Sequence, residues 1–153
     1  MNAKAGIALP EAYSIHRDTV ANKADQLDPV ILARIRRGAE TVAADYIDLL
    51  RIRRELILRS RKATRDFDAM LLPTVPIVAP TFDEVATPEA FMQKDALILR
   101  NTRLVNFLDR CAITLPIHTP GEAPVGLMLI GEHGHDRRLI SVGLGVEAAL
   151  AQR

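Results

Sequence analysis

Residues 106–131 read NFLDRCAITLPIHTPGEAPVGLMLIG and contain two short apolar runs, 112–117 and 125–130. Each run is bounded by proline or glycine, and a turn-rich segment, Thr119–Glu122, separates them. Such runs are typical of buried strands. Neither run alternates apolar with polar residues, so both faces of each strand are expected to be covered, as in an α/β sheet.

A third strand and three long helices are predicted from the residues around this stretch. The third strand covers 69–72 and ends at Pro73, after which a proline-rich loop runs to Pro88. The helices are expected at 29–64, with Asp28 as N-cap, at 89–108, and at 136–150, with Asp136 as N-cap and apolar residues on nearly every side. The first helix would exceed ~50 Å, so either Gly38 bends it or it lies across a body larger than this chain.

The composition of the 153 residues, 48% hydrophobic but only 4% aromatic, fits a soluble aliphatic core rather than disorder, and the net charge is +1. This charge gives no reason to expect a nucleic-acid or membrane partner. Arginines crowd the predicted 29–64 helix, but a solvated face is favoured over a nucleic-acid groove, because Tyr46 is its one aromatic residue. One cysteine and no apolar run of membrane-spanning length predict a cytoplasmic location.

Several residues could act as metal ligands, nucleophiles or bases, but they lack the spacing of a known site. His133, His135 and Asp136 suggest a metal cluster, but no further ligand has zinc-site spacing, so no metal is expected. Cys111 and His118 would lie about 23 Å apart along an extended strand, which is too far for a nucleophile and its base. No serine occurs in Gly-x-Ser-x-Gly, and none of Lys4, Lys23, Lys62 and Lys94 occurs in Ser-x-x-Lys. The spacing of these residues therefore indicates no activated nucleophile.

The chain nevertheless resembles the C-terminal third of the amidase signature family over nearly its whole length. The matching pieces are, in order, Asp68-Ala-Met-Leu-Leu-Pro-Thr-Val-Pro-Ile-Val-Ala-Pro, Asn101 and Asn106, Ala112-Ile-Thr-Leu-Pro, Pro124-Val-Gly-Leu-Met-Leu-Ile-Gly, Asp136-Arg-Arg-Leu-Ile and Glu147. This resemblance implies hydrolysis of a carboxamide, or transfer of its ammonia, by a Ser–cis-Ser–Lys triad without metal or organic cofactor. It also implies a partial domain, 1–153, that supplies three strands of a larger mixed sheet.

The catalytic residues of that family correspond to no position here, since the sequence has no Gly-Gly-Ser-Ser run and no Ser-Ser pair. The chain alone is therefore expected to be inactive. By resemblance, Thr74 and Ile77 are the candidates to line the substrate channel; a strand-ending turn and a packed loop are their alternative roles. The sequence departs from the family pattern at Arg110, where related members often have a small residue.

Partners follow from the same resemblance. We expect an N-terminal amidase portion to complete the fold, or a homo-oligomer to cover the exposed edges and faces. A small-molecule amide is the expected substrate once the fold is complete. A non-catalytic binding or oligomerising module derived from this fold is the alternative, and a helical nucleic-acid adaptor is the third hypothesis.

Overall fold

The structure is a computed structural model that describes residues 6–152. It divides into two units, one ending at Glu55 and the other beginning at Leu56. The long helix α3 contributes residues to both. Each unit is described by itself below.

Within residues 6–55, the elements of the first unit are all helices. They are α1 (Ala8–Asn22), η1 (Ala24–Gln26), α2 (Pro29–Arg37), η2 (Gly38–Glu40) and the first part of α3 (Ala43–Thr64). The predicted N-cap of α2 is confirmed, because Asp28 Oδ1 accepts hydrogen bonds from the backbone N–H groups of Val30 at 2.9 Å and Ile31 at 3.1 Å. Pro29 occupies the first helical position, where its missing N–H costs no intrahelical bond.

The prediction of one continuous helix over 29–64 is wrong. The chain leaves the α-helix after Arg37, makes the short turn η2 and starts α3 at Ala43. The break lies at Gly38, which is one of the two alternatives that the helix length suggested. A Cβ at this position would overlap the backbone oxygen of Leu9, so only glycine allows α1 to approach so closely.

The second unit holds the sheet. After the rest of α3 it contains β1 (Met70–Pro73), η3 (Asp83–Val85), α4 (Pro88–Ile98), α5 (Arg100–Phe107), β2 (Cys111–Pro116), β3 (Gly126–Gly131) and α6 (Asp136–Leu150). The strands lie in the order β1-β3-β2, and both pairs are antiparallel. All three predicted strands are therefore confirmed, with each boundary shifted by one residue.

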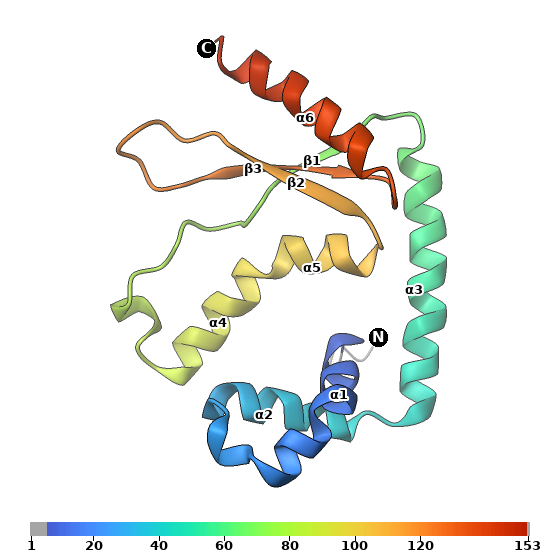
Figure 1. Ribbon diagram of the computed structural model, residues 1–153, viewed down its shortest axis with the longest axis vertical. Helices are drawn as coiled ribbons and strands as arrows, with labels where there is room; N and C mark the ends of the chain where they lie inside the picture. Colours follow the sequence, from blue (N-terminus) through green and yellow to red (C-terminus); the bar gives the residue numbers. More distant parts are fainter. Residues whose placement is uncertain (1–5, 153) are drawn as a thin grey trace. The chain divides into compact units, whose positions relative to one another are not determined.

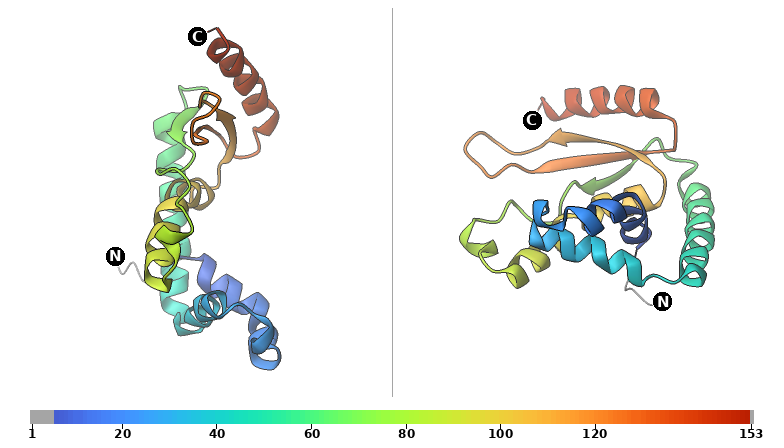
Figure 2. Two further views of the ribbon diagram at one scale, coloured as in Figure 1. Left: turned by 90° about the vertical axis from the view of Figure 1, so that its left-hand side faces the viewer. Right: turned by 60° about the horizontal axis from the view of Figure 1, so that its bottom comes forward.

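Helices cover the two faces of the central strand β3, with α5 on one side of the sheet and α6 on the other (Figures 1 and 2). Met128 and Ile130 face Val105 of α5. Leu129 packs with Leu139 of α6. The prediction of two covered faces thus holds for β3. Within residues 6–152, β1 and β2 are edge strands, and each pairs with another strand on one side only.

The two remaining helix predictions are partly corrected. The predicted helix 89–108 is two helices, α4 and α5, which meet at Leu99. The exposed helix α4 contributes no buried residue, whereas α5 turns Asn101 and Val105 into the interior.

The helix α6 has the predicted bounds, but His135 rather than Asp136 is its N-cap. It is also not a buried helix, because Ile140 and Leu144 are 51% and 62% exposed. These two side chains lie one turn apart on a face that the rest of the second unit leaves largely exposed.

Candidate functional site

Thr74, one of the two predicted channel residues, lies where β1 ends and the long loop begins. Its backbone N–H donates to the carbonyl of Gly126 at 2.8 Å, which extends the β1–β3 ladder by one pair. Its side-chain Oγ1 lies 3.1 Å from Oγ1 of Thr114 on β2, and either hydroxyl can be the donor. The two side chains therefore meet across the intervening strand, and we refer to them as the threonine pair.

The threonine pair depends on Gly126 beneath it. A Cβ on this residue would lie 2.6 Å from Cγ2 of Thr114 and 2.7 Å from Oγ1 of Thr74. Both distances are too short for a side chain, so glycine leaves the space in which the two hydroxyls meet. Sequence reasoning missed Thr114, since the contact joins residues 40 positions apart.

A third polar side chain fixes the end of β1. Asn101 on α5 donates from Nδ2 to the carbonyl of Pro73 at 2.7 Å, and only 9% of Asn101 is exposed. This bond satisfies a carbonyl that the β1–β3 ladder leaves unused, and it anchors the residue just before Thr74.

Chemically, the threonine pair can both donate and accept hydrogen bonds. Two hydroxyls that share one hydrogen bond keep one O–H donor and several acceptor lone pairs for a ligand. The side-chain hydrogen bond of each hydroxyl joins it to the other threonine, which is not a base that could take its proton.

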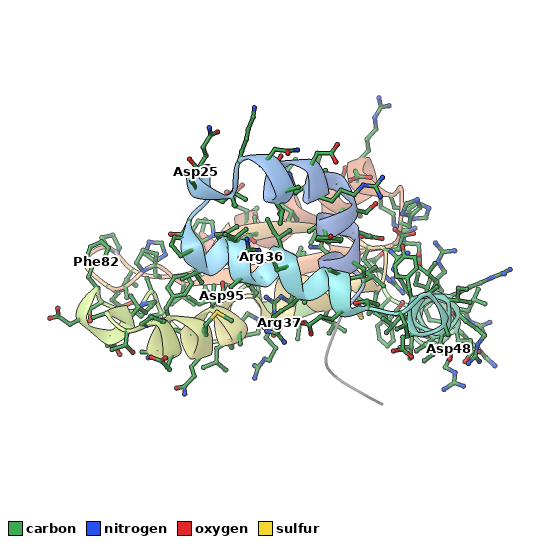
Figure 3. The ribbon with its side chains drawn as sticks, turned by 90° about the horizontal axis from the view of Figure 1, so that it is seen from below. Asp25, Arg36, Arg37, Asp48, Phe82 and Asp95 are labelled. Carbon is green, nitrogen blue, oxygen red and sulfur yellow. The ribbon has the colours of Figure 1, made fainter. Side chains whose placement is uncertain are left out.

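Ile77, the second predicted channel residue, lies three residues farther along the loop and is half-buried. It belongs to neither apolar cluster of the sheet. The loop beyond it is more open: Val78 is 51% exposed and Phe82 is 95% exposed. Figure 3 shows Phe82 standing off the segment that precedes α4.

The cysteine and histidines of the second unit form separate contacts. Cys111 Sγ donates to the carbonyl of Glu132 at 3.1 Å, and burial, followed by the negative charge of Asp136, raises the pKa of its thiol. His118 Nδ1 lies 3.4 Å from the N–H of Val125, at the other end of β2. Cys111 and His118 are therefore not brought together.

His133 makes a different contact again, with Nδ1 3.3 Å from Oδ2 of Asp109. Among residues 6–152, no group of three or more His, Cys, Asp or Glu side chains is arranged to hold a metal ion.

The serine hydroxyls of the second unit are engaged with groups other than lysine. Ser60 Oγ accepts from Arg110 at 3.0 Å, and Ser141 Oγ donates to the carbonyl of Arg137 at 3.1 Å. Lys94 Nζ lies 3.1 Å from a carboxylate oxygen of Glu84. Lys4 lies outside the described residues.

A cavity of about 240 Å³ lies at the opposite end of the sheet from the threonine pair. Its lining includes Met70, Ile130 and the charged residues Arg110 and Glu132. The Arg110 side chain is 3% exposed; its Nη1 lies 3.3 Å from Glu132, and its Nη2 donates to Ser60 at 3.0 Å and to Thr64 at 2.9 Å. Arg110, where the sequence departs from the family pattern, is thus a buried side chain held by partly buried partners.

No helix within residues 6–152 combines the length and the apolar character that crossing a membrane requires.

The sequence matches one family model and several relatives. The family model described as Amidase matches residues 2–140. A 2-amino-5-chloromuconic acid deaminase of Comamonas testosteroni is 30% identical over 97% of this chain and 32% of its own length. A subunit of the glutamyl-tRNA(Gln) amidotransferase of Archaeoglobus fulgidus is 27% identical over 90% of this chain and 30% of its own length.

A solved structure shares the fold. An allophanate hydrolase of Kluyveromyces lactis superposes with a TM-score of 0.77 at 26% identity, over 88% of this chain and 22% of that protein. The chain therefore spans about a third or less of the proteins it resembles. With a family model that matches most of its residues, the chain belongs to the amidase family.

Proposed function

We propose that residues 1–153 are the C-terminal segment of an amidase domain, which hydrolyses the C–N bond of a carboxamide once N-terminal residues of that domain complete it. The observation that carries this proposal is the family match over residues 2–140, combined with a span of only 32% of the Comamonas deaminase. The name of the Archaeoglobus relative, which is one component of an amidotransferase, supports a role within a larger assembly.

The contacts of the segment support a non-catalytic role for it in isolation. Hydrolysis of an amide needs an activated nucleophile and donors preorganised for the oxyanion. The sequence has no Ser-Ser pair, and the hydroxyls of Ser60 and Ser141 are hydrogen-bonded to an arginine and to a backbone carbonyl. We therefore assign the nucleophile and its base to the N-terminal portion of the domain.

Within the completed domain, we assign Thr74 and Ile77 to the wall of the substrate channel. The support for Thr74 is its place at the end of β1, where Gly126 leaves space beside its hydroxyl. The support for Ile77 is its half-buried position on the same loop, outside both apolar clusters.

The test is an ammonia-release assay on the purified 153-residue chain with simple aliphatic and aromatic amides. Circular dichroism and light scattering after size exclusion would run in parallel. We expect a folded species without turnover above the buffer rate. Turnover that persists in independently purified, sequence-verified samples would show that the segment carries its own nucleophile and would sink the proposal.

A second candidate function is a non-catalytic module that assembles with copies of itself. The observation that favours it is the set of exposed apolar side chains on the sheet edge and on α6: Leu71, Ile140 and Leu144, which are 56%, 51% and 62% exposed. Association would cover them. The same light-scattering experiment decides, since a monodisperse monomer that unfolds cooperatively contradicts this candidate.

A further inference from the structure

The cavity of about 240 Å³ in the second unit has an apolar part and a cationic part in its lining. The apolar part comes from β1, β3 and α6, which contribute Met70, Ile130 and Leu139. Ile130 and Leu139 are 2% and 3% exposed, so this part of the lining belongs to the packed core. A hydrocarbon group that lies against it is removed from water, which favours binding.

The cationic part of the lining is centred on Arg110. Its side chain is 3% exposed, and within residues 6–152 its Nε has no hydrogen-bond partner. Its carboxylate partner Glu132 also lies 2.9 Å from Nε of Arg61, so two guanidinium groups share one negative charge. The Arg61 side chain is 42% exposed and is also stabilised by water, whereas Arg110 is not. Arg110 therefore lacks one acceptor and part of its counter-charge, which is unfavourable for a buried group.

The start of α6 adds positive potential to the same lining. His135, which is the N-cap of this 15-residue helix, and Arg138 in its first turn both line the cavity. No side chain caps the N–H groups at this end of the helix. Such N–H groups and the helix dipole attract anions. Asp136 lies in the same turn but is not among the residues that line the cavity.

The carboxylates in the lining are already engaged by arginines. Asp68 lies 2.6 Å from Nη2 of Arg138, and Glu132 pairs with the two arginines described above. Arg65 also lines the cavity, and its ion pair with the preceding strand connection is weak, because both side chains are largely exposed. Three arginines and two carboxylates therefore leave the lining with an excess of positive charge, which favours an anion over a cation.

We propose that this cavity binds a small organic carboxylate, whose carboxylate group lies beside Arg110 and whose apolar body lies against Met70, Ile130 and Leu139. The ligand supplies the acceptor and the negative charge that the buried guanidinium lacks, in the pairing that guanidinium groups favour. Inorganic phosphate would meet the arginines but leave the apolar part of the lining uncovered. The inference goes beyond the proposed function, because the cavity and the threonine pair lie at opposite ends of the sheet.

The experiment titrates the 153-residue chain with sodium benzoate, which carries a carboxylate and an apolar ring. Calorimetry measures the affinity, and NMR follows the amides of Ile130, Gly131 and Leu139 and the Nε–H of Arg110. We expect saturable binding with a Kd of about 1 mM or lower and shift changes concentrated in these signals. Benzyl alcohol has a similar shape without the charge, and inorganic phosphate has charge without the ring. Each should bind at least about tenfold more weakly than benzoate.

Variants test the arginines of the lining. Arg110→Met removes the guanidinium and should weaken benzoate binding at least about tenfold. Arg138→Gln removes a second cation, leaves Asp68 unpaired in the lining, and should weaken binding at least about threefold. Arg51→Gln is the matched control: the Arg51 and Arg138 side chains are both 63% exposed and both pair with an aspartate, but Arg51 does not line the cavity. If circular dichroism shows that Arg110→Met unfolds the protein, the comparison of Arg138→Gln with Arg51→Gln decides.

Four outcomes overturn the inference. The first is no saturable binding of benzoate at concentrations up to about 20 mM, which would occupy most of a site with the expected affinity. The second is equal binding of benzyl alcohol, which would make the cavity an apolar pocket without anion selectivity. The third is an equal loss of affinity in the Arg138 and Arg51 variants. The fourth is a set of shift changes confined to Thr74 and Thr114, which would place the ligand at the threonine pair instead.

Discussion

At the scale of single residues, the candidate site depends on Gly126, a residue that has no side chain. The threonine pair joins two strands that are not neighbours in the sheet, and it can do so because Gly126 on the strand between them has no Cβ. Threonine is β-branched and stiff at χ1, so neither Thr74 nor Thr114 can move its γ atoms aside without changing rotamer. A single methyl group at Gly126 should therefore disturb both.

We expect Gly126→Ala to lower the free energy of unfolding by about 1–3 kcal/mol, because the new methyl overlaps Thr114 and displaces the Thr74 hydroxyl. Urea denaturation followed by circular dichroism measures the change. The double variant Gly126→Ala with Thr114→Ser should recover part of the loss, since serine lacks the Cγ2 that is overlapped.

Gly145 provides the matched control for this prediction. It lies inside α6, and a Cβ there would meet nothing within 4 Å. Gly145→Ala should raise the free energy of unfolding by about 0.5–1 kcal/mol through helix propensity. Equal effects of the two substitutions would mean that the space above Gly126 plays no special part.

At the scale of elements, the caps of the helices are set by local sequence. Asp28 and Thr87 each accept hydrogen bonds from the first turn of the helix that follows, and a proline occupies the first position of both helices. These caps satisfy N–H groups that have no partner within the helix.

We expect Asp28→Ala to destabilise the first unit by about 1 kcal/mol, because two N–H groups of α2 lose their acceptor. Asp28→Asn keeps an acceptor oxygen and should cost less than half as much. Hydrogen exchange of the Val30 and Ile31 amides gives the measurement. Faster exchange in the asparagine variant than in the alanine variant would contradict the capping role.

The sequence predicts correctly those helices and strands whose ends are set by residues at the ends themselves. The three strands are predicted within one residue, because proline and glycine end them at Pro73, Pro116 and Gly131. The break at Gly38 is only one of two alternatives, because the close approach of Leu9 that requires it joins distant residues. Neither proline nor glycine marks the interruption at Leu99, and sequence reasoning misses it.

Other features depend on what lies next to an element. The apolar sequence of α6 predicts burial, yet Ile140 and Leu144 are exposed, since hydrophobic periodicity identifies an apolar face but not its partner. Thr74 is identified by family resemblance, and its role in a substrate channel stays a prediction. Thr114 is missed, because its contact with Thr74 requires the strand order β1-β3-β2.

At the scale of the whole molecule, the Glu132 carboxylate forms ion pairs with two other segments of the second unit. Glu132 follows β3, and its carboxylate lies 2.9 Å from Nε of Arg61 on α3 and 3.3 Å from Nη1 of Arg110, just before β2. Arg110 is 3% exposed on its side chain, so its charge relies on this carboxylate rather than on water. Within residues 6–152, its Nε has no hydrogen-bond partner.

We expect Glu132→Gln to lower the free energy of unfolding by about 2–3 kcal/mol, since it leaves a buried guanidinium without its counter-charge. The loss stays below the value for a fully buried pair because the Glu132 side chain is 31% exposed. Replacing both partners, with Arg110→Met and Glu132→Gln, should be less destabilising than Glu132→Gln alone, because no buried charge remains. Asp68→Asn is the control for an exposed ion pair. Asp68 lies 2.6 Å from Arg138, and the side chains of Asp68 and Arg138 are 71% and 63% exposed. Breaking this pair should change the free energy of unfolding by less than about 0.5 kcal/mol. Urea denaturation of the unchanged chain and of these three variants measures the free energies of unfolding. A double variant less stable than Glu132→Gln would contradict the prediction. It would mean that Arg110 stabilises the second unit through its hydrogen bonds to Ser60 and Thr64 more than through its charge pair.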